Sequence, residues 1–278
     1  MAQIADDCSA LSKKDRSGSI YSFGETDQAA ERLRVVAQVF EPTSEALVSE
    51  TVLDHPRLTV DPGCGPGFTT RLLSRVARSA RTVGIDRSEP FLSRARASSV
   101  AREEYIAADL AVTSLRSAGI GAPPDLIYMR FLASHLPEPV RAISGWAKEL
   151  EPGGLLLAEE VDSINTKVAA FDEYLKIVSQ MLAWYGNELF VGARLGANQW
   201  NTDLSIVINR ATEVRPTTGD AARMFSLNIS NWRRDPYVEA VYPSDKLESL
   251  TTELDGLIDS TETGQITWQI RQICLRRK

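Results

Sequence analysis

A glycine-rich turn preceded by an acid carries the clearest chemistry in this chain. The sequence LTVDPGCGPG places Asp61 before glycines at three alternate positions, Gly63, Gly65 and Gly67. Glycine adopts positive φ angles without steric cost and lets the backbone approach a ligand closely. Apolar residues at helical spacing over residues 68–80 predict a helix directly after the turn. A strand, a glycine turn and a helix in this order are typical of a nucleotide-binding unit.

Two further acids follow at intervals that suit a nucleoside. Asp86 ends the strand-like residues 81–86, about 20 residues beyond the glycines, where an acid meets the ribose hydroxyls. Asp109 lies in a second strand-like run, residues 105–110. Dinucleotide dehydrogenases use G-x-G-x-x-G to hold a pyrophosphate, which an acid before the glycines would repel. The pattern therefore disfavours an NAD(P)-dependent oxidoreductase, the weakest alternative.

Taken in this order, the motifs resemble those of the class I S-adenosylmethionine (SAM)-dependent methyltransferases over about residues 55–162. The resemblance implies SAM as the cofactor and no metal. It implies that Asp61 lies near the SAM ammonium, Asp86 binds the ribose and Asp109 faces the adenine amino group. It also implies a wider set of cofactor-binding residues: Tyr21, Arg32, Gly63, Gly65, Arg87, Leu110 and Arg130.

The resemblance implies an α/β fold of Rossmann-like class I methyltransferase type. We expect a seven-stranded, mostly parallel sheet with helices on both faces, an N-terminal helical lid and an insertion after strand five. Apolar patterning supports strands at residues 125–130, 155–160 and 204–209, and a helix at residues 245–258. Residues 265–275 alternate between apolar and polar side chains, which predicts a half-buried edge strand that the family runs antiparallel.

Two prolines modify these expectations. Pro62 lacks an amide donor, so strand one is predicted to end at or before Asp61. Residues 27–40 carry a helical apolar stripe, and Pro42-Thr43 is predicted to open a second helix.

The chain is predicted to divide into an N-terminal helical lid, residues 1–50, and a SAM-binding domain, residues 51–278. A substrate-covering insertion is expected at about residues 163–200, where Trp184 and Tyr185 would form an aromatic wall. In the lid, Tyr21 would cap the cofactor, and Arg32 would pair with its carboxylate. Alternatively, Tyr21 packs in the protein interior, Arg32 lies on the surface, and the helix that contains Trp184 and Tyr185 only covers the sheet.

Methyl transfer from a sulfonium depends on holding the acceptor in line with the methyl group, and it needs a base only when the acceptor must lose a proton. His55 precedes strand one, at the far end of the sheet from the glycine turn, which excludes it as that base. His135 follows strand four and is the candidate base and a substrate contact, although it can equally shape the start of a helix. Glu159, Glu160 and Asp162 end strand five and are rival candidates for substrate contact. Glu159 and Glu160 lie on opposite faces, so at most one of them points into the site, and Glu160 is the chosen candidate.

Composition narrows the partners. The net charge of −6 and the scattered arginines disfavour nucleic acid, which selects a basic surface. The three cysteines, Cys8, Cys64 and Cys274, match no metal spacing and favour a reducing compartment. No signal peptide and no apolar run of about 20 residues is found, so we expect a cytoplasmic protein without a membrane span. The chain is also a candidate for homodimer formation.

These observations predict a SAM-dependent methyltransferase that acts on an O or N atom of a small molecule, in specialised metabolism. The alternative is a SAM-fold protein that binds the cofactor without methyl transfer, as a cyclase or scaffold.

Overall fold

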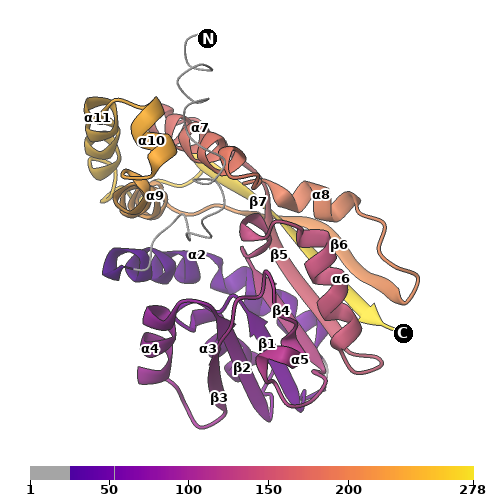
Figure 1. Ribbon diagram of the computed structural model, residues 1–278. Coiled ribbons are helices and arrows are strands. Elements are labelled where there is room, and N and C mark those ends of the chain that lie inside the picture. Colours follow the sequence, from indigo (N-terminus) through magenta and orange to yellow (C-terminus); the bar gives the residue numbers. More distant parts are fainter. Residues whose placement is uncertain (1–25, 53) are drawn as a thin grey trace. The chain divides into compact units, whose positions relative to one another are not determined.

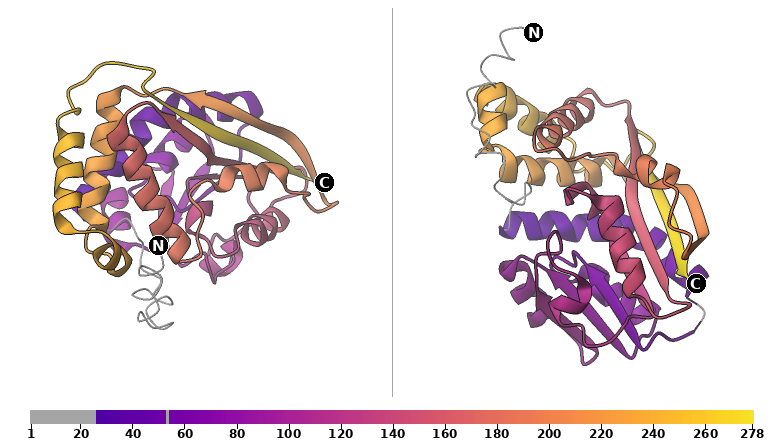
Figure 2. Two further views of the ribbon diagram at one scale, coloured as in Figure 1. Left: turned by 90° about the horizontal axis from the view of Figure 1, so that it is seen from above. Right: turned by 45° about the vertical axis from the view of Figure 1, so that its right-hand side comes forward.

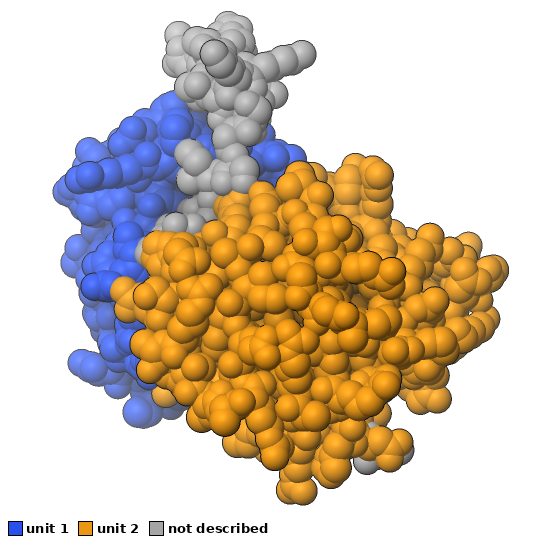
Figure 3. All heavy atoms as spheres, turned by 60° about the horizontal axis from the view of Figure 1, so that its bottom comes forward, with its two compact units in different colours: residues 1–35, 165–189, 215–267 blue, residues 36–164, 190–214, 268–278 orange. Residues whose placement is uncertain are grey.

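The computed structural model describes residues 26–52 and 54–278 (Figure 1). The chain forms two compact units. Unit 1 comprises residues 1–35, 165–189 and 215–267, and unit 2 comprises residues 36–164, 190–214 and 268–278 (Figure 3). Their limits do not coincide with the lid and domain predicted from the sequence, and that division stays a prediction.

The strands of the described residues form one seven-stranded sheet in the order β3-β2-β1-β4-β5-β7-β6. The neighbouring pairs β1–β2, β1–β4, β2–β3 and β4–β5 are parallel, whereas β6 and β7 are antiparallel. The predicted α/β fold with a mostly parallel sheet is thereby confirmed. The strand bounds are β1 Leu58–Pro62, β2 Arg81–Asp86, β3 Glu103–Ala107, β4 Leu126–Arg130, β5 Leu155–Thr166, β6 Leu204–Val214 and β7 Ile266–Arg277.

Unit 2 has three layers, because strand β4 contributes apolar side chains to two separate cores. Leu126 and Tyr128 join the core under α2 (Asp27–Thr51) and α3 (Phe68–Val76). Ile127 and Met129, which alternate with them, join the core that contains residues of the helices on the other face. Those helices are α5 Leu115–Ala118, α6 Pro139–Glu149 and α8 Val191–Ala197. The strands and their flanking helices can be followed in Figure 1 and Figure 2.

The remaining helices in the described residues are α4 Glu89–Ala97, α7 Ala169–Trp184, α9 Thr218–Trp232, α10 Pro236–Val241 and α11 Ser244–Asp255, with the 3-10 helix η1 Ala133–His135. In unit 1, the ring of Phe225 on α9 stacks on Tyr174 of α7 at 4.0 Å between centroids and meets Phe171 edge-on at 5.3 Å. Within the described ranges, none of the helices has the length and apolar character that crossing a bilayer demands.

Several strand ends differ from the sequence predictions. β5 continues to Thr166 and β6 to Val214, so the predicted ends at Glu160 and Asn209 are wrong.

β1 continues through Pro62, which pairs with Ile85, so the predicted end at or before Asp61 is wrong by one residue. The missing donor is tolerated because Pro62 is the last residue of its strand. β3 stops at Ala107 rather than near residue 110, because the carbonyl of Asp109 already accepts a turn hydrogen bond from the amide of Thr113.

The predicted edge position of residues 265–275 is also wrong. β7 lies between β5 and β6, and β6 forms that edge of the sheet. The sequence alternates in the first half of β7, but Ile273, Cys274 and Leu275 are buried in succession. Consecutive burial is what a strand covered on both faces requires.

Helix α2 does not break at Pro42. It runs without interruption from Asp27 to Thr51, with Pro42 in its interior, so the predicted second helix is wrong. An interior proline removes one helical hydrogen bond and crowds the preceding turn, at a cost of roughly 3 kcal/mol. The helix continues because the turns beyond Pro42 bury Leu47 and Val48 completely in the core of unit 2.

We therefore expect Pro42→Ala to stabilise the protein by about 2 kcal/mol, since the helical cost of about 3 kcal/mol is offset by up to about 1 kcal/mol through the freer unfolded chain. Denaturant unfolding measures this change. Pro236→Ala is the matched control, because Pro236 occupies the first turn of α10, where proline is favoured. An equal gain from both substitutions would contradict the explanation.

Candidate functional site

The candidate site of unit 2 lies where the strand order reverses. β1 stands between β2 and β4, and the parallel strands end at one edge of the sheet. In open α/β sheets, ligands bind in the crevice at such a switch point. The edge carries ionisable residues at or next to the ends of β1, β2 and β4, namely Asp61, Asp86 and Arg130. Glu159 and Glu160 lie within β5, where Glu159 pairs with Arg130.

The glycine turn after β1 has the backbone geometry that the sequence predicts. Gly63, Gly65 and Gly67 have φ angles of +74°, +52° and +80°. A Cβ atom on Gly67 would lie 2.7 Å from the hydroxyl of Tyr105. The amides of Gly63 and Cys64 both donate to the carbonyl of Ile85, at 2.7 and 3.1 Å. The turn is thus fixed against the end of β2.

Asp61 is a buried anchor for the helix that follows the turn. Its side chain is 1% exposed, and Oδ2 accepts hydrogen bonds from the hydroxyls of Thr69 and Thr70, each at 2.6 Å. Burial raises the pKa of Asp61 to about 6, although both hydroxyls and the positive charge of Arg130 lower it. The carboxylate therefore ties α3 to β1, and its predicted place near the SAM ammonium stays a prediction.

Asp86 ends β2 and Asp109 follows β3, and the predicted contacts of both carboxylates with the cofactor stay predictions. Asp86 is half-buried, and its Oδ2 and Oδ1 accept from the amides of Gly65 and Ser88, both at 2.8 Å. Asp109 is half-buried two residues beyond β3, and its Oδ1 accepts from the amide of Ala111 at 2.9 Å.

The segment after β4 is pinned by β5. Phe131 has a φ of +55°, a strained conformation for an aromatic residue, and its amide donates to the carbonyl of Glu159 at 2.9 Å. Oε1 of Glu160 accepts from the amides of Leu132 and Ala133, at 2.8 and 2.7 Å. Glu160 is 1% exposed and holds this loop, so the predicted substrate contact of its carboxylate stays a prediction.

The structure brings most of the predicted site residues together in unit 2. Arg87 is exposed directly after β2, Leu110 is 9% exposed, and half-buried His135 ends η1. Arg130 ends β4, where its Nη1 donates to Oγ of Ser44 at 2.9 Å. Their contacts with cofactor or substrate stay predictions.

The other predicted residues belong to unit 1 or lie outside the described residues. Tyr21 is outside them. Arg32 donates through Nη1 to Oδ1 of Asn228 at 2.8 Å. Trp184 stacks on Tyr237 at 5.4 Å between ring centroids. The Tyr185 hydroxyl donates to Oδ2 of Asp235 at 2.9 Å.

Sequence reasoning missed several residues that build the edge: Ser44, Thr69, Thr70, Phe131 and Gln272. The two threonines follow the glycine turn directly, and hydroxyls at a helix start are a recognisable signal. Ser44 and Gln272 gave no such signal, because their partner Glu159 is 115 and 113 residues away in the chain.

Glu160 makes stability depend on pH. Burial raises its pKa from 4.5 to about 8, against the lowering effect of the two backbone amides. Because the folded pKa is the higher one, the protonated group contributes stability that is complete below pH 4.5 and is lost as the pH rises through about 8.

We expect the melting temperature of the native protein to fall between about pH 6 and about pH 9 more than that of Glu160→Gln, which cannot ionise and keeps an acceptor for both amides. Thermal unfolding at both pH values measures the difference. Glu138→Gln, at an exposed position, is the matched control and should follow the native curve. Parallel curves for all three proteins would refute the assignment.

Comparisons with known proteins agree with this geometry. Residues 60–158 match the family model described as a methyltransferase domain. The chain is 30% identical over 203 residues to the trans-aconitate 2-methyltransferase of Azoarcus sp. (strain BH72), covering 70% of this chain and 75% of that protein. It is 33% identical over 123 residues to the enzyme of the same name from Methylobacterium radiotolerans, covering 44% of this chain and 45% of that protein.

The crystal structure of coclaurine N-methyltransferase, bound to N-methylheliamine and SAH, has a TM-score of 0.51 at 14% identity and covers 85% of this chain and 72% of that chain. At this identity the likeness concerns the fold. With the sheet order, the glycine turn and the relatives in agreement, the chain belongs to the class I SAM-dependent methyltransferases, and its cofactor is SAM.

Proposed function

We propose that this methyltransferase transfers the methyl group of SAM to an oxygen of a small carboxylic acid. The observation that carries the proposal is the relationship to two enzymes named for trans-aconitate, a tricarboxylic acid. Transfer to a nitrogen or to a hydroxyl of another small molecule is the broader alternative that the same site allows.

The residues at the sheet edge fit SAM in three respects. Asp86 is half-buried at the end of β2 and bonded to the amide of Gly65 in the glycine turn, the position at which an acid meets the ribose hydroxyls. The glycine turn takes positive φ angles and packs tightly, because a side chain at Gly63 would meet Leu132 and one at Gly67 would meet Tyr105, each at 2.7 Å. Arg130 provides a cation at the end of β4 for the carboxylate of the methionine portion. The bound cofactor supplies an electrophilic methyl group.

A carboxylate acceptor also suits the chemistry of the available groups. It is ionised at neutral pH, so its oxygen attacks without losing a proton. Asp61, Glu159 and Glu160 are each 1% exposed and already accept hydrogen bonds within the protein, so none is placed as a free base. Under this proposal the protein binds and orients the acceptor, and His135 shapes the loop after β4 rather than removing a proton.

His135→Asn tests this directly. With a carboxylic acid acceptor we expect kcat to change by less than about threefold, whereas loss of a general base costs roughly 10²–10⁴-fold. Methyl transfer from labelled SAM is measured against a panel of di- and tricarboxylic acids, phenols and amines. Turnover of phenols or amines alone, with a large loss in His135→Asn, would contradict the carboxylic acid proposal and restore His135 as a base.

Asp86→Ala tests the cofactor site. We expect SAM affinity to fall by about 1.5–3 kcal/mol, the scale of hydrogen bonds to a charged acceptor. Calorimetry measures the affinity, and Asp203→Ala, which removes an exposed acid at another edge of unit 2, is the control for net charge. A variant that melts early yet binds SAM normally would make Asp86 a purely structural residue.

We further infer that the enzyme acts in the cytoplasm and in specialised metabolism. Cys64 and Cys274 are free thiols, which supports a reducing compartment. Homodimerisation also stays a prediction, which light scattering tests.

A further inference from the structure

We propose that Ser44 and Glu159 are positioning residues that hold the Arg130 guanidinium ready for the carboxylate of the SAM methionine portion. The inference rests on the cofactor role given to Arg130 in the proposed function. It adds two residues that the sequence motifs do not assign, one on α2 and one on β5.

Arg130, Ser44 and Glu159 are connected by two consecutive hydrogen bonds, in which each residue donates to the next. Nη1 of Arg130 donates to Oγ of Ser44 at 2.9 Å, and the Ser44 hydroxyl donates to Oε2 of Glu159 at 2.5 Å. Ser44 is 0% exposed and Glu159 is 1% exposed. The Ser44 hydroxyl also lies 3.1 Å from the carbonyl of Phe40, but Glu159 is the nearer acceptor. A hydroxyl has a single proton, so a Ser44 that donates to Glu159 presents its lone pairs to Arg130. The buried carboxylate thereby orients the hydroxyl that orients the guanidinium.

Glu159 is itself fixed from two other strands. The Tyr128 hydroxyl on β4 donates to its Oε2 at 2.5 Å, and Nε2 of Gln272 on β7 donates to its Oε1 at 2.8 Å. The orientation of the Gln272 amide is determined in turn, because its Oε1 accepts from Nε of Arg210 at 2.9 Å and from the hydroxyl of Thr212 at 3.0 Å. Every oxygen of the Glu159 carboxylate thus has a directed donor.

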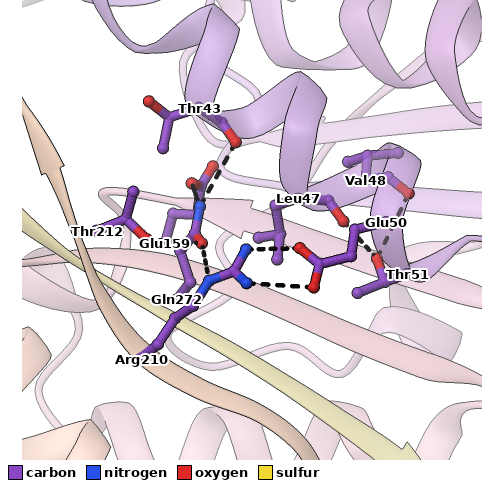
Figure 4. A network of polar contacts seen from close by, with 9 residues as sticks. All are labelled: Thr43, Leu47, Val48, Glu50, Thr51, Glu159, Arg210, Thr212 and Gln272. Carbon is purple, nitrogen blue, oxygen red and sulfur yellow. Dashed lines mark hydrogen bonds and ion pairs between the residues drawn. The ribbon is translucent and has the colours of Figure 1, made fainter.

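The network also seats the end of α2 on the sheet. Arg210 on β6 pairs with both carboxylate oxygens of Glu50, at 3.2 and 2.7 Å, and Gln272 reaches the carbonyl of Thr43 at 3.5 Å (Figure 4). Ser44 follows Thr43 on the same helix, so correct seating of α2 places the Ser44 hydroxyl between Arg130 and Glu159.

Holding Arg130 before the ligand arrives matters because arginine has a long side chain with many rotamers. A guanidinium that is already in place loses less conformational entropy when it binds a carboxylate. Arg130 is the last residue of β4, and β4 pairs with β1. Arg130 therefore lies at the switch point between β1 and β4, where the cofactor crevice opens.

The test compares two ligands that differ in the part Arg130 would hold. S-adenosylhomocysteine carries the amino acid carboxylate, whereas 5′-methylthioadenosine lacks it. Calorimetry with the full-length protein should find that Ser44→Ala weakens S-adenosylhomocysteine binding about tenfold, the lower end of what a hydrogen bond to a charged group supplies. Binding of 5′-methylthioadenosine should be unchanged.

Thr51→Val is the matched control. It removes a hydroxyl from the same helix α2, one that donates to the carbonyl of Leu47 at 2.7 Å rather than to Glu159. We expect Thr51→Val to keep the native ratio of the two affinities, whatever it does to stability. Glu159→Gln, which keeps the shape of the side chain, is the second variant and should behave as Ser44→Ala does.

Arg130→Ala should lose the preference for S-adenosylhomocysteine to a greater extent than either positioning variant. If Arg130→Ala keeps that preference, Arg130 does not hold the carboxylate, and the inference fails. If Arg130→Ala loses it but Ser44→Ala and Glu159→Gln keep it, or change both ligands equally, the network only seats α2 and the positioning role is refuted. These are equilibrium binding measurements, so their outcome is independent of which acceptor the enzyme methylates.

Discussion

A carboxylate that is removed from water must find hydrogen-bond donors, since an unsatisfied buried charge is far too costly to keep. Three such groups stand at one edge of the sheet in unit 2: Asp61, Glu159 and Glu160. Each recruits its donors from a different segment. Asp61 accepts hydrogen bonds from the start of α3, and Glu160 accepts them from the loop after β4. Glu159 accepts hydrogen bonds from side chains on α2, β4 and β7. The arrangement of the crevice depends on these three demands.

The same demands decide which groups remain for a ligand. Asp61, Glu159 and Glu160 are buried and already accept hydrogen bonds from the protein, so this edge is organised for binding and orientation. That suits methyl transfer, in which alignment of the two reacting atoms supplies much of the rate. The strained backbone of Phe131 belongs to this organisation, because its φ of +55° turns the chain so that the next two amides reach Glu160.

Helix α2 shows how packing overrides a local preference. Proline in a helix interior is unfavourable, yet α2 passes through Pro42 and continues for more than two turns. Its last part buries Leu47 and Val48 and places Ser44 against Glu159, so ending the helix at Pro42 would forfeit apolar burial and leave a buried carboxylate with one donor fewer. Together, the lost burial of Leu47 and Val48 and the lost hydrogen bond to Glu159 would cost more than the interior proline does.

The sequence alone determined the features that depend on neighbouring residues. The glycines at positions 63, 65 and 67 predicted a turn with positive φ angles, which the structure confirms. Residues 81–86 form the predicted strand, which ends in Asp86. These are local properties, because φ preferences and strand periodicity act over a few residues. The family resemblance then supplied the sheet, the cofactor and the reaction class.

Only the tertiary structure decided which groups meet across long stretches of chain. It placed β7 inside the sheet, carried α2 through Pro42, turned Asp61 toward two threonines and joined Ser44 to Glu159. None of these follows from local patterning, because each is settled by the need to cover apolar surface and to satisfy buried polar atoms with partners that are distant in sequence.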